Sequence, residues 1–358
     1  MRKLLFVRRN HTPYGGAERY LQRLREALRR RGISSEVIHR SYPRAVPSWL
    51  KPLLFDREVC RRRSAHGTDA TLFSLERISC PDIYRAGDGV HRAFLRSKGP
   101  TLNPLHLSYL WLEKRTFENA RVIIANSRMV RDQILEYYPQ VAPEKIHVVY
   151  NGIPLPEKFD KAAAKAALAS ELGFDPGRPL LLFVGSGFRR KGVRELLRLL
   201  SELRGDFHAC IVGKEKRLRD YKKLAAKLGL ESRVDFTGPR KDVERFYAAA
   251  DLFLFPTRYE PFSNVVLEAL SYSNVVFTTR QNGAAEILPD SWVMRTPDDL
   301  SVTAVVDEYL RDSGLLAEGS SRARKIAENF PIERNVDETL RVLDKIQGKL
   351  PEQPKDAS

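Results

Sequence analysis

The sequence has no long apolar run and nowhere approaches the roughly 18 consecutive apolar residues that a membrane-spanning helix needs. Glycine and proline are infrequent, with 21 of each among 358 residues, which excludes a collagen-like or low-complexity chain. The apolar stretch at residues 4–7 ends at Arg8 and is shorter than the roughly 7–15 apolar residues of a secretory signal. We therefore expect a globular cytoplasmic chain. Its length predicts two domains, because one core rarely exceeds about 250–300 residues.

Cysteine is also scarce. The three cysteines, Cys60, Cys80 and Cys210, form no CxxC pair, and an odd number cannot all pair with one another. This usage is typical of a reducing compartment, so we expect small buried side chains and no structural zinc site.

Positive charge is abundant but unevenly distributed. Residues 1–150 contain 28 Lys and Arg against 14 Asp and Glu, whereas the remaining residues contain 33 against 31. Such asymmetry indicates an anionic partner for the first half: nucleic acid, acidic lipid headgroups or a phosphorylated acceptor. A basic surface kept only for solubility would give the same count.

Short apolar runs alternate with helical patterns along the chain. We expect strands at residues 4–7, 36–39, 122–125, 147–150, 180–184, 208–212, 234–237, 252–255 and 274–278. Expected helices lie at 17–31, 127–138, 191–203, 217–228, 241–249, 264–272 and 331–350. This alternation predicts parallel sheets covered on both faces, which bind ligands beyond the carboxyl ends of their strands.

A phosphate-binding loop is expected after the strand at 180–184. Gly185, Ser186 and Gly187 let a ligand approach the backbone, and a helix follows whose free N–H groups favour an anion. Arg190 and Lys191 can add charge-assisted hydrogen bonds to phosphate. The alternative is a structural turn with solvated cations.

Two glutamates follow the strand at 252–255. Glu260 lies in the loop and can accept hydrogen bonds from ligand hydroxyls, while Glu268 lies in the next helix and can hold a vicinal diol such as ribose. A charge in that apolar helix needs a partner, and a salt-bridged glutamate is the alternative. Gly15 and Gly16, after the first strand, allow close approach of a phosphate or a sugar, although an ordinary turn would also use them.

Taken in order, Gly15-Gly16, residues 185–192, Gly238-Pro239-Arg240 and the Glu260/Glu268 pair resemble the retaining GT-B glycosyltransferases of family 4. The resemblance covers essentially the whole chain. It implies an α/β fold of two Rossmann-like doubly wound domains facing a cleft. Residues 1–154 would bind the acceptor, with 335–358 crossing back onto them, and 155–334 would bind the nucleotide sugar. Residues 185–192 and 84–89 further resemble the lipopolysaccharide core heptose α-1,3-glucosyltransferases.

The resemblance also implies roles for individual residues. Arg190 and Lys191 would neutralise the donor diphosphate, and Glu260 would bind donor sugar hydroxyls. Asp88 is the candidate for orienting or deprotonating the acceptor hydroxyl, although a turn aspartate would look the same. The implied donor-binding residues are Gly15, Gly16, Gly185, Ser186, Lys214, Arg240, Lys241, Val243, Phe262, Ser263, Asn264 and Glu268.

The sequence contains no Asp-x-Asp pair, on which the metal-dependent transferases of the other fold rely. The resemblance therefore implies a metal-independent, retaining hexosyltransferase with no cofactor, in which cations and a helix end stabilise the departing nucleotide. The expected donor is a UDP-sugar, with UDP-glucose favoured.

Residues 85–121 interleave cations with aromatic and apolar side chains. This pattern is typical of an interfacial membrane contact or a single-stranded nucleic-acid groove, and core aromatics would also produce it. We expect a peripheral enzyme on the cytoplasmic face of the inner membrane. Its partners would be a UDP-sugar, a lipid-linked oligosaccharide acceptor and an anionic membrane surface, without nucleic acid. Alternatives are a capsule or O-antigen transferase, a nucleotide-sugar epimerase and a basic nucleic-acid-binding protein.

Overall fold

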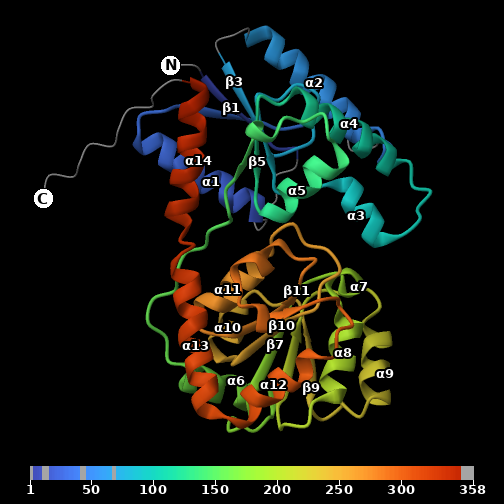
Figure 1. Ribbon diagram of the computed structural model, residues 1–358, viewed down its shortest axis with the longest axis vertical. Coiled ribbons are helices and arrows are strands. Elements are labelled where there is room, and N and C mark those ends of the chain that lie inside the picture. The colour runs from blue at the N-terminus through green and yellow to red at the C-terminus, as the bar shows by residue number, and fades with distance from the viewer. Residues whose placement is uncertain (1–2, 10–15, 41–45, 67–69, 348–358) are drawn as a thin grey trace, which may run out of the picture. The chain divides into compact units, whose positions relative to one another are not determined.

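The computed structural model describes residues 3–9, 16–40, 46–66 and 70–347 (Figure 1). The chain divides into two compact units, one of residues 1–151 with 333–358 and the other of residues 152–332. The boundaries expected from the sequence, after residues 154 and 334, lie within three residues of these. Within the described part of the chain, none of the helices combines the length and apolar character required to cross a membrane.

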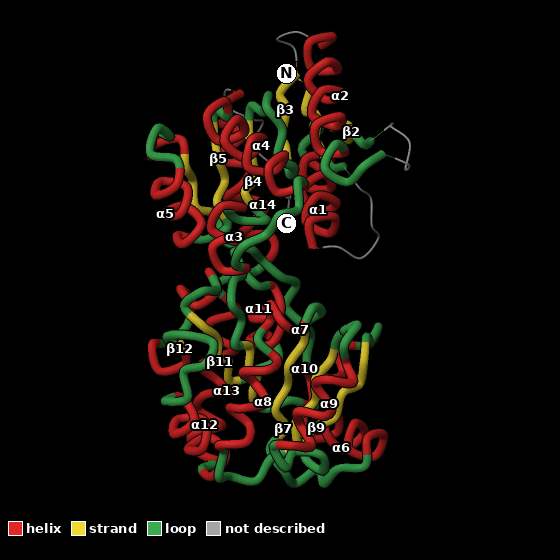
Figure 2. The backbone as a smooth tube through the Cα atoms, turned by 90° about the vertical axis from the view of Figure 1, so that its right-hand side faces the viewer, coloured by secondary structure: helices red, strands yellow, loops and turns green. Residues whose placement is uncertain are grey.

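The first unit contains a parallel six-stranded sheet in the order β2-β1-β3-β4-β5-β6, with helices on both faces (Figure 2). Its strands are β1 Lys3–Val7, β2 Ser35–Ile38, β3 Ala70–Ser74, β4 Ile83–Ala86, β5 Val122–Ala125 and β6 Ile146–Val148. Its helices are α1 Gly16–Arg30, α2 Lys51–His66, α3 His91–Lys98, α4 Leu105–Asn119, α5 Arg128–Tyr137, the 3₁₀ turn η2 Pro143–Lys145 and the C-terminal α14 Ile332–Gln347.

The C-terminal helix packs on this first sheet. Leu340 and Leu343 of α14 share one buried cluster with Leu4 of β1 and Leu24 of α1. The hydroxyl groups of Tyr20 and Thr339 lie 3.2 Å apart in the same region. The return of the chain to its first unit is therefore stabilised by burial of apolar side chains.

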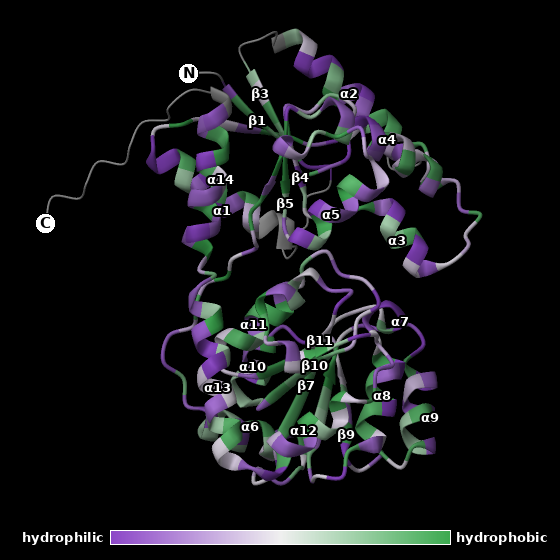
Figure 3. Cartoon of the chain, in the orientation of Figure 1, coloured by the Kyte–Doolittle hydropathy of each residue, from purple (hydrophilic) through white to green (hydrophobic). Residues whose placement is uncertain are grey.

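The second unit has a parallel sheet in the order β12-β11-β10-β7-β8-β9. Its strands are apolar along most of their length (Figure 3), as expected where helices cover both faces. The strands are β7 Leu180–Val184, β8 His208–Val212, β9 Val234–Gly238, β10 Leu252–Phe255, β11 Val275–Thr279 and β12 Val293–Met294. The helices are α6 Lys161–Leu172, α7 Phe188–Lys191, α8 Val193–Glu202, α9 Leu218–Lys227, α10 Val243–Ala249, α11 Asn264–Ser271, η3 Gly283–Ile287, η4 Asp290–Trp292, α12 Val302–Arg311 and α13 Ser313–Glu328.

The helix expected at 191–203 is present as α8, and Gly192 separates it from the short helix α7, which sequence reasoning missed. Gly192 has a φ of +79°, in the left-handed region that favours glycine. A Cβ atom at this position would also collide with the carbonyl oxygen of Pro256, so both the conformation and the space require glycine here.

The expectation of three unpaired cysteines is also wrong. Cys60 of α2 and Cys80 of the β3–β4 loop form a disulfide, while Cys210 is free and buried in β8. No local pattern indicates this bond, because the packing of α2 beside the β3–β4 loop brings together two residues that lie 20 apart in the chain.

Candidate active site

The candidate site of the second unit lies where two neighbouring strands end. β7 and β10 pair in parallel, so the loop after Val184 and the loop after Phe255 leave the sheet at the same edge. The Glu260 carboxylate forms ion pairs with both Lys191 and Arg190, and its Oε1 atom lies 2.6 Å from Lys191 Nζ. Three of the four residues expected to be catalytic therefore meet at one point.

Burial of the side chains changes the pKa values of the two cations beside Glu260. The side chains of Lys191 and Glu260 are only 12% and 11% exposed, whereas that of Arg190 is 42% exposed. Burial, together with the Arg190 guanidinium, lowers the pKa of Lys191 to about 7. Burial also lowers the pKa of Arg190. The Glu260 carboxylate acts in the opposite direction, since it favours the charged forms of both side chains.

The two cations have further partners that fix their positions. Arg190 Nη1 donates a hydrogen bond of 3.2 Å to the carbonyl oxygen of Tyr259. Lys191 Nζ lies 4.9 Å from the centre of the Phe255 ring, within cation–π range. The backbone N–H of Arg258 donates to the carbonyl oxygen of Arg190, which ties the two loops together.

A third loop, after β11, holds the Glu260 loop in place. The N–H of Glu260 donates to the carbonyl oxygen of Gln281, and the N–H of Gly283 donates to that of Glu260. The buried Asn282 side chain accepts from the N–H groups of Ser263 and Ala284 at 3.2 and 3.1 Å. Its amide donates to Thr278 Oγ1 at 3.1 Å. Sequence reasoning missed Asn282, although Asn282-Gly283 after a strand is a turn signal.

This network changes one expectation about the donor sugar. Ser263 was expected to bind the donor together with Phe262 and Asn264, yet its backbone N–H donates to Asn282. Phe262 and Ser263 are buried and Asn264 is the first residue of α11. Ser263 therefore contributes to the shape of the loop.

The expected phosphate loop is bound to the β8–α9 connection. Ser186 Oγ accepts from the N–H of Lys214 at 3.0 Å, and Gly187 N–H donates to the Lys214 carbonyl oxygen. The Cβ of any larger residue at 213 would collide with the carbonyl oxygen of Gly185, so Gly213 is required for this approach. Glu215, which sequence reasoning missed, accepts from the N–H of Phe188 at 2.8 Å.

The remaining donor-binding candidates of the second unit lie around α10 and α11. Glu268 Oε2 accepts a hydrogen bond of 3.0 Å from the Tyr247 hydroxyl. Arg240 pairs with Asp242 and Glu171, which offset its charge. Lys241 is exposed and Val243 begins α10.

Comparisons with known proteins identify the family of the chain. Residues 164–329 match the family described as "Glycosyl transferases group 1", and residues 65–156 match "Glycosyltransferase Family 4". The chain is a family 4 glycosyltransferase with the GT-B fold.

Two relatives of this glycosyltransferase are named for lipopolysaccharide synthesis. "Lipopolysaccharide glucosyltransferase WaaG" of Escherichia coli is 26% identical over 309 residues, which are 78% of this chain and 81% of the relative. "Lipopolysaccharide core biosynthesis glycosyltransferase LpsE" of Rhizobium meliloti is 26% identical over 328 residues, 86% of this chain and 84% of the relative.

Solved structures show the same fold. The WaaG crystal structure has a TM-score of 0.79 at 24% identity, covering 97% of this chain and all of that one. The Anabaena HepE structure in complex with UDP-glucose has a TM-score of 0.74 at 19% identity, covering 96% of this chain and all of that one.

Asp88 belongs to the first unit of the glycosyltransferase, in an exposed turn directly after β4. Its carboxylate acts electrostatically on Glu76, Arg77 and Tyr84. Gly16 begins α1, and Gly15 lies outside the described residues.

A group of charged side chains that sequence reasoning missed follows β1 and β3 of the same unit. Arg8 Nη1 lies 3.0 Å from Glu76 Oε1, and Arg9 Nη2 donates to the Tyr109 hydroxyl at 2.9 Å. Burial raises the pKa of Glu76, while Arg9 and Arg8 lower it. Guanidinium and carboxylate groups beside an aromatic ring can bind the hydroxyl groups and the apolar face of a sugar.

Proposed function

We propose that the chain transfers glucose from UDP-glucose, with retention of configuration, to a heptose of a lipopolysaccharide core. Two observations about its relatives support this choice of substrates. Two relatives that share most of their length with this chain are named for lipopolysaccharide glucosyl transfer and core biosynthesis. A structure of the same fold holds UDP-glucose.

The observation that carries the proposal is the meeting of Arg190, Lys191 and Glu260 beyond adjacent strands. In the structure the carboxylate is paired with both cations. We infer that the donor exchanges these partners: its diphosphate takes Arg190 and Lys191, and its sugar hydroxyls take Glu260. Two cations fixed before the reaction would stabilise the charge that develops on the departing UDP, without a metal ion.

The lipid-linked acceptor requires contact with a membrane, for which the first unit has an exposed surface. Leu107 and Trp111 of α4 are 70% and 47% exposed, and the Arg115 guanidinium lies 5.1 Å from the Trp111 ring centre. Trp49 is also exposed, and its carbonyl oxygen accepts a hydrogen bond from Ser108 of the same helix. Exposed aromatic side chains with adjacent cations suit an anionic membrane surface.

We therefore propose peripheral association with the cytoplasmic face of the inner membrane. Sedimentation with liposomes that contain anionic lipid should recover the wild type at low salt and less of it at high salt. Leu107→Ala with Trp111→Ala should reduce binding. Equal recovery with neutral and anionic liposomes at every salt concentration would contradict the proposal.

Donor binding tests the proposed function directly. Thermal shift and calorimetry would compare UDP, UDP-glucose, UDP-galactose, UDP-N-acetylglucosamine and GDP-mannose. A ligand at about 100 times its Kd stabilises the folded state by about 2.7 kcal/mol, a readily measured shift. We expect UDP-glucose to give the largest effect. Lys191→Ala should remove it, and Glu202→Gln, an exposed position at the end of α8, should retain it. Absence of stabilisation by any nucleotide would refute the proposal.

A further inference from the structure

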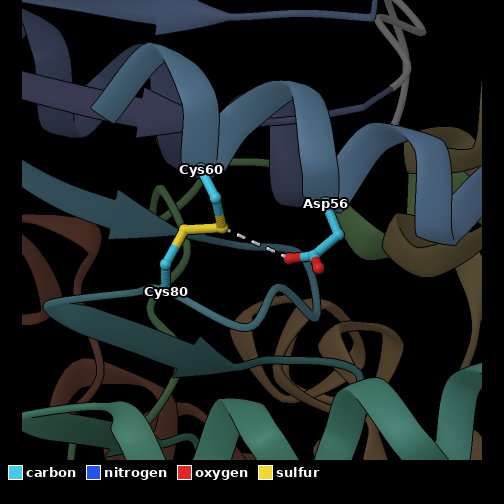
Figure 4. A group of neighbouring side chains, drawn as sticks. All are labelled: Asp56, Cys60 and Cys80. Atoms are coloured by element: carbon cyan, nitrogen blue, oxygen red, sulfur yellow. Dashed lines mark hydrogen bonds between the residues drawn. A yellow bond between two sulfur atoms is a disulfide. The ribbon is translucent and has the colours of Figure 1, made fainter. Parts of the chain in front are cut away.

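The disulfide lies next to a buried carboxylate. Asp56 and Cys60 are four residues apart on α2 and share one face of the helix. Cys80 comes from the β3–β4 loop. The possible ligand atoms of these three residues lie within 4.8 Å of one another (Figure 4). Asp56 is buried, whereas Cys60 and Cys80 are half-buried and lie near the surface of the unit.

Side chains other than the sulfurs hold the β3–β4 loop against α2. Asp56 Oδ1 accepts from the N–H of Ser79 at 2.5 Å, and both Asp56 oxygens accept from the Ser79 hydroxyl at 3.0 and 2.9 Å. Arg63 donates to the carbonyl oxygen of Cys80 and forms an ion pair of 2.6 Å with Asp82. These contacts lie on both sides of the disulfide along α2.

Helix α4 holds the same loop from a second direction. Thr116 Oγ1 donates to the carbonyl oxygen of Ile78 at 2.7 Å. Asn119 Nδ2 donates to the carbonyl oxygen of Ser79, also at 2.7 Å. Because none of these hydrogen bonds depends on the sulfur atoms, cleavage of the disulfide leaves Cys60 and Cys80 beside each other and beside Asp56.

We propose that the reduced chain binds one thiophilic divalent cation, such as Zn²⁺, through Cys60 Sγ, Cys80 Sγ and a carboxylate oxygen of Asp56. Two thiolates and one carboxylate are ligands that Zn²⁺ accepts, and water can fill the fourth position of a tetrahedral site. The Arg63 guanidinium, which contacts the Cys80 carbonyl oxygen and Asp82, offsets part of the negative charge of three anionic ligands.

The cation and the disulfide exclude each other. Binding of Zn²⁺ releases one proton from each thiol and forms two Zn–S bonds. Formation of the disulfide instead removes two electrons and two protons, which pass to an oxidised low-molecular-weight disulfide and convert it into two thiols. In a reducing compartment the cation thus replaces the disulfide as the link between α2 and the β3–β4 loop. The inference is independent of the proposed transferase substrates.

The test is a metal titration of the full chain in two redox states. One sample is reduced with a phosphine and freed of reductant without oxygen, and the other keeps its disulfide. Co²⁺ reports thiolate coordination by its charge-transfer absorption, and Zn²⁺ then displaces it. We expect one ion per reduced chain and at least about 100-fold weaker binding to the oxidised chain. Because both samples have the wild-type sequence, this comparison does not depend on a variant that could fail to fold.

Variants assign the ligands. Cys60→Ser and Cys80→Ser should each abolish the charge-transfer absorption, and Asp56→Asn should weaken binding about tenfold while retaining that absorption. The matched control is Cys210→Ser, which removes the free thiol buried in the second unit and should bind like the wild type. Equal binding by the reduced and oxidised chains, or binding that survives in Cys60→Ser, would overturn the inference.

Discussion

The paired cations and carboxylate of the second unit predict that one substitution has opposite effects on two ligands. In Glu260→Gln, Arg190 and Lys191 lose the carboxylate with which they are paired in the free protein. UDP carries a diphosphate but no sugar, so it should bind more tightly to the variant. UDP-glucose should lose the hydrogen bonds that its sugar makes with the carboxylate.

The expected size of each effect follows from charge and burial. The Glu260 carboxylate repels a diphosphate bound by the same two cations. Two unit charges about 5 Å apart interact by about 3 kcal/mol at an effective dielectric constant of about 20. Arg190 is 42% exposed, so solvent screens part of this interaction. We therefore expect about 1.4 kcal/mol, or about tenfold tighter UDP binding. Loss of a hydrogen bond to a charged group costs about 1.5–3 kcal/mol, so the preference for UDP-glucose over UDP should fall by about 10- to 150-fold.

Calorimetry with UDP and UDP-glucose on both proteins measures the two changes separately, and a transfer assay measures kcat/KM. Glu202→Gln is the matched control, because it removes one exposed carboxylate from α8 in the same unit. If Glu260→Gln weakened the binding of UDP as much as the binding of UDP-glucose, the carboxylate would serve only to position the two cations. The assignment of Glu260 to the sugar would then be refuted.

Further predictions concern single side chains in both units. The affinity for UDP-glucose should decrease up to tenfold per pH unit above pH 7, because Lys191, whose pKa is about 7, binds phosphate only when protonated. Calorimetry from pH 6 to 9 measures this dependence, which should be absent in Lys191→Arg. Asn282→Ala should lower kcat at least about tenfold with a smaller change in UDP affinity, since it releases the loop that carries Glu260 and leaves the cations in place. Glu113→Ala should destabilise the first unit by about 3–5 kcal/mol in thermal unfolding, because the fully buried carboxylate pairs with Arg77 at 2.9 Å. The Lys114–Glu118 pair of the same helix, with side chains 62% and 32% exposed, provides the control, and Glu118→Gln should cost less than about 1 kcal/mol.

Much of the sheet architecture could be predicted from apolar runs, and three strands show where such patterns fail. All nine expected strands are present, but β3, β4 and the two-residue β12 were missed. β4 contains Arg85, a charge that interrupts the apolar pattern. In the folded chain Arg85 is buried, with its guanidinium 3.9 Å from the Tyr20 ring centre and a hydrogen bond of 2.7 Å to Asn151. Partners so distant in sequence cannot be recognised from the local pattern.

Some residues of the site could be predicted from the sequence in the same way, and others could not. Arg190, Lys191 and Glu260 could be placed together because parallel strands of one sheet end at a common edge. Asn282 and Glu113 could not, since their roles depend on backbone N–H groups that only the folded chain brings near them. The Cys60–Cys80 pair was missed because spacing in sequence does not reveal which cysteines meet.

Identification of the reaction product tests the proposed glucosyl transfer with retention. The wild type would be incubated with UDP-glucose and a lipopolysaccharide core truncated at heptose, and the product analysed by mass spectrometry and by NMR of its anomeric proton. We expect one added hexose in α linkage, and its loss in Lys191→Ala. A β-linked product, or transfer that persists in Lys191→Ala, would contradict the proposal.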